Sequence, residues 1–185
     1  MTSILGLPAH PLFAHIPVVL IPLAAIGAVA MLWPSVRDRI GWVVVGLVFV
    51  SGIVTQLAIS SGQNLEEYVK ETQLVRDHAK MGESLRPWVL LMFLSLLGVM
   101  VVAHLARRSA PSDGAEPGPA AAKTRDRLKY AGIAAMVFSL LFSAAATVSV
   151  FRIGHSGSKA VWHSTQVKID KGAKESGGSE SDTGG

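Results

Sequence analysis

The sequence predicts an all-α integral membrane protein: a four-helix bundle with an amphipathic helical connection between the second and third spans. Half of the 185 residues are apolar, and they gather in four long runs that contain no Asp, Glu, Lys or Arg. A helix needs about 20 apolar residues to cross roughly 30 Å of hydrocarbon. The runs reach that length, at residues 11–33, 40–59, 87–106 and 130–151.

We place the four spans at about 11–33, 40–61, 87–107 and 129–152, in one membrane domain of residues 1–165. The first run lacks the basic flank of a signal peptide, and prolines interrupt it, so we expect it to be retained. A segment at about 109–123 is rich in Pro, Gly, Ala and Ser, which is typical of a flexible linker. Residues 166–185 are too polar to form a core and are expected to be disordered.

The connection between the second and third spans, residues 65–85, has its own pattern. Apolar residues recur at nearly helical spacing, beginning with Leu65, Tyr68 and Val69, and charged residues lie between them. This pattern predicts an amphipathic helix that lies on the membrane surface or covers the end of the bundle.

An even number of spans places both termini and the 65–85 connection on one side of the membrane, which we call side A. The loop 34–39 and the linker lie on the other, side B. Eight Lys or Arg residues on side B lie close to helix ends, and the first 36 residues carry none. The positive-inside rule therefore favours side B in the cytoplasm, with the termini extracytoplasmic in the cell membrane. Because these charges flank membrane helices, we expect the lipid bilayer as partner and no nucleic acid.

Five of the six histidines fall on side A. They are His10, His15, His78, His155 and His163. The sixth, His104, lies at the side B end of the third span. Ionisable side chains at membrane depth usually face the bundle interior or a cavity. If the first helix begins at Pro11, His15 lies about one turn inside it, which makes it the strongest candidate ligand.

Three uses of these histidines remain open from the residues. The first is haem b, because haem iron takes axial imidazoles and bundles hold cofactors between facing helices. The second is a bare copper or zinc ion, which imidazole also suits. The third needs no cofactor: the histidines bind loops and headgroups in a membrane scaffold or interaction protein.

For haem or a bare metal, the candidate ligands are His15, His78 and His155, with His15 and one of the other two as the axial pair. His10 would support the ligands or anchor the loop. Positively charged side chains near side A would pair with the haem propionates, because guanidinium binds carboxylate through two hydrogen bonds. They are Arg86, Arg152 and Lys80.

The stretches "GLPAHPLFAHIPVVLIPLA", "VRDHAKMG" and "FRIGHSGSKAVWH" together resemble a family of small four-span bacterial membrane proteins known only as a domain of unknown function. The family has a His-Pro-x-x-x-His-x-Pro opening, a histidine ahead of the third span and a Gly-His-x-Gly element after the fourth. These features correspond to His10 and His15, to His78, and to His155. The resemblance covers about residues 7–162, and His163 has no counterpart.

This family is distantly similar to the membrane domains of b-type cytochromes, and some relatives are joined to iron–sulfur domains. The resemblance implies a haem or redox role, with a redox partner protein or quinone. No nucleophile–base pair and no carboxylate pair lies within a span, so we expect no hydrolase or transferase and at most an electron-transfer component. The chain has no cysteine, which excludes disulfides and thiolate ligands.

Overall fold

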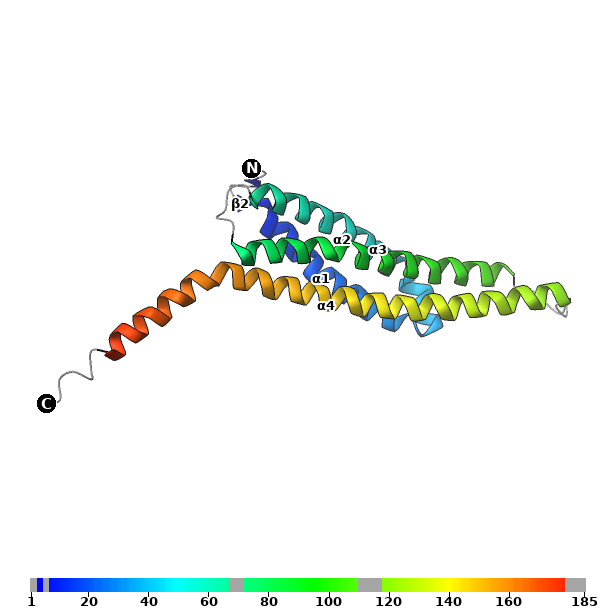
Figure 1. The fold of residues 1–185 in the computed structure, drawn as a ribbon. Helices are drawn as coiled ribbons and strands as arrows, with labels where there is room; N and C mark the ends of the chain where they lie inside the picture. The colour runs from blue at the N-terminus through cyan, green and yellow to red at the C-terminus, as the bar shows by residue number, and fades with distance from the viewer. Residues whose placement is uncertain (1–2, 5–6, 67–71, 110–117, 179–185) are drawn as a thin grey trace.

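The computed structural model describes residues 3–4, 7–66, 72–109 and 118–178. Four helices make up most of it: α1 (Ala9–Ala30), α2 (Pro34–Glu66), α3 (Gln73–Arg108) and α4 (Pro119–Gly178). A short antiparallel pair, β1 (Ser3–Ile4) and β2 (Leu7–Pro8), precedes them. Each helix contains a segment long and apolar enough to cross a membrane. The prediction of an all-α membrane bundle is confirmed, and Figure 1 shows its elongated shape.

The helices extend beyond the apolar runs. α2 begins at Pro34, so residues 34–39, which we expected in a loop, form its first turns. Proline is favoured at the first position of a helix, where its missing N–H has no intrahelical partner to lose. α3 begins after Thr72, whose Oγ1 accepts a hydrogen bond from the Val75 amide at 3.3 Å. From Gln73, the predicted amphipathic connection and the third span form one continuous helix.

α4 is the longest helix, and it exceeds the fourth span at both ends. It begins at Pro119, inside the segment predicted as a linker, and continues to Gly178, past the predicted domain end at residue 165. Figure 1 shows its C-terminal part, orange to red, extending beyond the other helices. The remaining parts of the predicted linker, 110–117, and of the predicted disordered tail, 179–185, lie outside the described residues.

The length of α3 shows where the membrane ends on side A. Its 36 residues span about 54 Å at 1.5 Å per residue, well over the roughly 30 Å of hydrocarbon. The charge-free part, 87–106, matches that thickness. The preceding turns, 73–86, carry five charged residues and therefore lie outside the membrane-spanning segment.

The core follows a heptad pattern, with buried positions three and four residues apart, as expected for helices packing at small crossing angles. On α1 the buried residues are Pro17, Ile21, Ala24 and Ala28, and the buried Met31 follows directly after the helix. On α3 they are Leu85, Val89, Met92, Leu96, Val99, Met100 and Ala103. Apolar side chains off these stripes are exposed, for example Ile26 at 68% and Leu90 at 56%. These outer faces are the surface that a bilayer covers.

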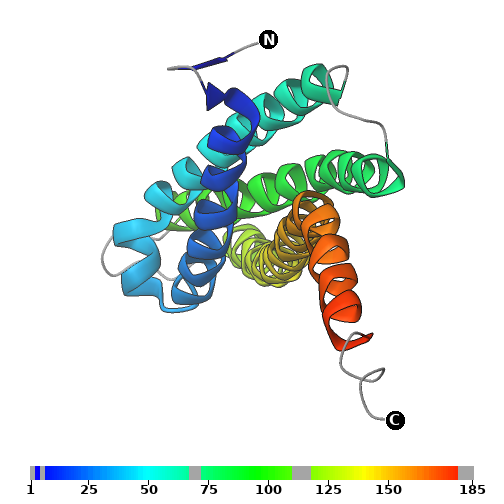
Figure 2. The ribbon, with the colours of Figure 1, turned by 90° about the vertical axis from the view of Figure 1, so that its left-hand side faces the viewer.

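Each helix packs against two others. α1 and α3 both contact α2 and α4, so α1 lies diagonally opposite α3. The end-on view in Figure 2 shows α1 against α2, and the C-terminal part of α4 leaving the bundle. A Cβ added at Gly27 would lie 2.7 Å from Val44 Cγ2, so this glycine permits the close approach of α1 and α2.

Candidate functional site

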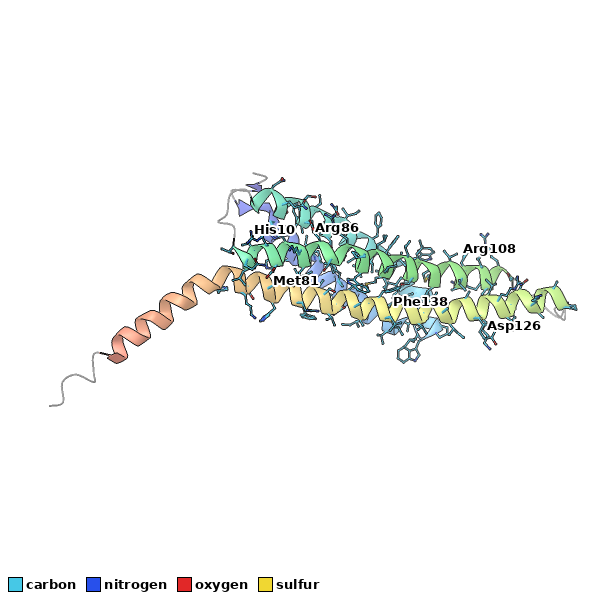
Figure 3. All side chains as sticks on the ribbon, in the orientation of Figure 1. His10, Met81, Arg86, Arg108, Asp126 and Phe138 are labelled. Carbon is cyan, nitrogen blue, oxygen red and sulfur yellow. The ribbon has the colours of Figure 1, made fainter. Side chains whose placement is uncertain are left out.

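Two histidines from the diagonal helices meet at the side A end of the bundle. His10 lies in the first turn of α1 and His78 in the second turn of α3. Both are partly buried, with ring centroids 6.2 Å apart and ring planes at 86°. Figure 3 shows His10 at the end of the bundle that also carries Met81 and Arg86. We refer to His10 and His78 as the histidine pair.

The hydrogen bond of His10 fixes the tautomer of its neutral ring. Its Nδ1 lies 2.8 Å from the carbonyl oxygen of Ala58 on α2. A carbonyl only accepts, so Nδ1 is the donor and carries the hydrogen. The Ser61 hydroxyl donates to the same carbonyl at 2.9 Å. The carbonyl oxygen of Ala58 therefore accepts two hydrogen bonds, one with each lone pair. In the neutral ring, the available lone pair is therefore on Nε2.

The hydrogen bonds of His78 lead to the same tautomer. Its Nδ1 lies 2.9 Å from Ser156 Oγ on α4, and this hydroxyl donates its one hydrogen to the Ile153 carbonyl at 2.8 Å. Ser156 Oγ must then accept from His78 Nδ1–H. The lone pair of neutral His78 is again on Nε2. Each of the four helices thus contributes a ring or an acceptor to the pair.

Two glycines make room for the rings. A Cβ at Gly62 on α2 would lie 3.0 Å from Cε1 and Nδ1 of His10, and one at Gly157 on α4 would lie 3.0 Å from Cε1 of His78. Ordinary contacts between carbon atoms are about 3.5–4.0 Å. A larger residue at either position would therefore displace an imidazole. Each ring lies against helix backbone on the side that also provides its acceptor.

The surroundings of His78 favour its neutral form. Burial lowers the pKa of His78, the neighbouring His10 lowers it further, and the Ile153 backbone opposes the shift by hydrogen bonding. A positive charge on His10 would repel a positive charge on His78, so this neighbour favours the neutral form of His78. Neutral imidazole is the form that binds metals.

The structure brings together only some of the residues that the sequence suggested. It pairs His78 with His10, whereas His15 on α1 and His155 on α4 have exposed side chains and are not part of the pair. Three further cationic candidates are exposed on α3 and α4, namely Lys80, Arg86 and Arg152. Across the described residues, no group of three His, Cys, Asp or Glu residues could hold a metal ion.

The heptad register is the signal that distinguishes His10 from His15. On α1 the stripe runs through residues 17 and 24, and one heptad before residue 17 it reaches His10. On α3 it runs through residues 85, 92 and 99, and one heptad earlier it reaches His78. His15 lies off this stripe. The core register therefore selects the pair, whereas depth in the first span pointed to His15.

Buried hydroxyls add polarity to the apolar core. Ser51 and Thr55 on α2 and Ser143 on α4 are at most 4% exposed, and their hydroxyl oxygens have no hydrogen-bond partner within the described residues. Ser139 differs, because its hydroxyl donates to the Met136 carbonyl at 2.8 Å. An unpartnered buried hydroxyl is costly. These hydroxyls are places where water or a polar ligand group gains hydrogen bonds.

Four apolar helices around a shared core define a multi-pass membrane protein of the lipid bilayer. Residues 6–170 match the model of a family described as predicted membrane protein (DUF2231), and the chain belongs to this family. The resemblance to a four-span family of unknown function is thereby confirmed. The comparisons with curated proteins and with solved structures give no match.

Proposed function

We propose that the protein binds one haem b through Nε2 of His10 and Nε2 of His78 and serves as an electron-transfer component of the membrane. The observation that carries the proposal is the spacing of the pair. Imidazole nitrogens bind metals at about 2.0 Å, and the two ring centroids are 6.2 Å apart. At this separation, both rings would be able to hold one metal centre between them.

The tautomers support the same proposal. A metal-bound histidine usually donates its other ring N–H to a carbonyl or a similar acceptor, which fixes the ring and raises the basicity of the ligating nitrogen. Both rings already make such a bond, His10 to the Ala58 carbonyl and His78 to Ser156. The proposal differs from the sequence-based expectation in one ligand, because His10 takes the place of His15.

The number of ligands favours haem over a zinc ion. Structural zinc takes four protein ligands, and catalytic zinc takes three. The described residues bring two imidazoles together here, and two protein ligands are what the six-coordinate haem of an electron-transfer cytochrome takes. The pair comes from diagonal helices, which is how bundles hold a cofactor between facing side chains.

Each part of the site then has a physical role. A bound haem b would supply one-electron chemistry, with a potential set by its ligands and surroundings. Ala58 and Ser156 orient the imidazoles and hold their Nδ1 protons. Arg86 and Arg152, exposed on α3 and α4, supply positive charge that suits propionates. The position at the end of the bundle is accessible to a partner protein or quinone.

The proposal includes an orientation. Basic residues near helix ends on side B favour the cytoplasm for that side, so the histidine pair and both termini would be extracytoplasmic. A reporter enzyme fused after Gly185, active only in the cytoplasm, tests this. Inactivity of the C-terminal fusion, together with activity of a fusion made after Arg108, is the expected result, and the reverse contradicts the orientation.

Visible spectra of detergent-purified protein, expressed with haem available, test the ligands. We expect a Soret band that shifts on reduction and is lost in both His10→Ala and His78→Ala. His104→Ala is the matched control, because His104 lies on α3 with His78 but at the opposite end, and it should keep the wild-type spectrum.

Three outcomes overturn the proposal. Loss of the band in His15→Ala but not in His10→Ala would return the ligand role to His15. Colourless wild-type protein that holds copper stoichiometrically would make the pair a bare-metal site. If the protein is colourless and metal-free, and its stability is unchanged in both His10→Ala and His78→Ala, the conclusion would be a membrane scaffold without a cofactor.

A further inference from the structure

The opposite end of the bundle contains a pocket that the histidine pair does not explain. It has a volume of about 1130 Å³ and lies mainly between the side B ends of α3 and α4. Figure 3 shows this end, marked by Arg108 and Asp126, at the far end of the bundle from His10. The pocket is therefore separate from the proposed haem site.

The mouth of the pocket is strongly cationic. Four basic residues line it, against the single acid Asp126. They are Arg37, Arg107, Arg125 and Lys129. Arg125 and Lys129 are four residues apart, so both project from the same face of α4. This composition favours a ligand with negative charge.

Pairing within the protein neutralises only part of this charge. Arg107 forms an ion pair with Asp38 at 3.0 Å. Arg37 Nε is 3.7 Å from the same carboxylate, and this buried nitrogen has no hydrogen-bond partner in the part of the chain that the structure describes. Among the same residues, Arg125 and Lys129 form no ion pair. An anion at the mouth would supply the missing partner.

The inner wall of the pocket is apolar. Val99 and Val102 on α3 and Met136 and Leu140 on α4 line it. All four lie within charge-free runs, at the depth of the hydrocarbon. The cationic residues lie at the ends of those runs, at the depth of the lipid headgroups. The cationic mouth of the pocket is therefore at the depth of a phospholipid headgroup, and the apolar wall is at the depth of its acyl chains.

We propose that this pocket binds one anionic glycerophospholipid of the bilayer. The headgroup phosphate lies against Arg125 and Lys129, and one acyl chain lies in the groove along Val102 and Met136. Basic pockets between membrane helices bind anionic headgroups in this way. Anionic lipids of the cytoplasmic leaflet meet side B in the orientation proposed above, but the binding itself depends on neither that orientation nor haem.

Native mass spectrometry of the full chain, with equal amounts of phosphatidylglycerol and phosphatidylcholine, tests the proposal. The test variant is R125Q/K129Q. The matched control is K123Q/R127Q, which removes the same charge from the same helix at exposed positions that do not line the pocket. At about 1 kcal/mol for each basic residue near an anionic headgroup, losing both lowers affinity for phosphatidylglycerol roughly 30-fold.

We expect the wild type and the control to retain one phosphatidylglycerol in preference to phosphatidylcholine, and R125Q/K129Q to lose that preference with an unchanged melting temperature. Equal retention of the two lipids by wild type overturns the proposal. So does an equal loss in both double variants, since that indicates a general effect of surface charge. Full displacement by glycerol phosphate, which has the headgroup but no acyl chain, would make the occupant a soluble phosphate.

Discussion

Gly157→Ala is the most direct perturbation of the histidine pair. The added Cβ would lie 3.0 Å from His78 Cε1 and 3.4 Å from Nδ1. Ordinary contacts of a Cβ begin near 3.4 Å, so the ring must move by a few tenths of an ångström. That movement stretches the 2.9 Å bond between His78 Nδ1 and Ser156 Oγ toward the usual limit of about 3.2 Å. Gly154→Ala is the matched control, because nothing lies within 4 Å of its added Cβ.

The expected magnitude combines three effects. Replacing Gly by Ala within a helix stabilises it by about 1 kcal/mol. Crowding in a packed site costs about 1–3 kcal/mol, and the stretched hydrogen bond costs about 0.5–1.5 kcal/mol. Gly154→Ala therefore gains stability, and Gly157→Ala should be less stable than this control by roughly 2–4 kcal/mol. For a chain of this size the two melting temperatures differ by roughly 5–15 °C.

Thermal unfolding of the purified protein in detergent, followed by tryptophan fluorescence, measures this difference. Prepared with haem available, Gly157→Ala should also lose the Soret band that Gly154→Ala keeps. Equal melting temperatures for the two variants would refute the packing of His78 against Gly157. If the two melting temperatures differ as expected but Gly157→Ala keeps the Soret band, the packing of His78 against Gly157 is supported and the ligand role of His78 is refuted.

The remaining predictions concern the hydrogen bonds and the core. Ser156→Ala removes the acceptor of His78 and should cost about 1 kcal/mol in thermal melts; Ser158→Ala, whose hydroxyl bonds the His155 carbonyl of its own helix, should cost nothing, and equal effects contradict the bond. The lowered pKa of His78 means that the unfolded chain takes up the proton first, so stability should fall as the pH drops below the ordinary value of 6.5. A melting temperature that stays flat down to about pH 5 refutes this linkage. Thr55→Val removes a buried, unpartnered hydroxyl and should raise stability by about 1 kcal/mol; a lower melting temperature would show that the hydroxyl has a partner.

The architecture could be predicted because membrane insertion depends on residues close together in the chain. Runs without charge, long enough to cross the hydrocarbon, identify four helices wherever they occur. The ends of the helices follow a different rule. Hydrogen-bonded turns continue into polar sequence, so α2 begins at Pro34 and α3 already at Gln73. Hydropathy alone therefore does not predict where these helices begin.

Charge-free runs and hydropathy could not identify His10 as the partner of His78. Depth along the first helix favoured His15, but the choice between His15 and His10 depends on which face of α1 is inside the bundle. That face is set by contacts with α2 and α4, which are distant in sequence. The acceptors of the pair, the Ala58 carbonyl and the Ser156 hydroxyl, belong to residues with no feature that identifies them alone. The heptad register of the core carries the information, and it must be read in both α1 and α3.

The same register explains why a polar site can exist in an otherwise apolar bundle. The last core position of each heptad stripe on side A lies where the helices leave the hydrocarbon. An apolar side chain at that position contributes less through burial than one deeper in the bundle. Histidine there still fills a core position, and its Nδ1 proton satisfies an acceptor on a neighbouring helix. Gly62 and Gly157 leave room for the two rings to lie close to α2 and α4. The geometry of the pair is thus fixed by the packing of all four helices, and a ligand bound between the rings would in turn stabilise the whole bundle.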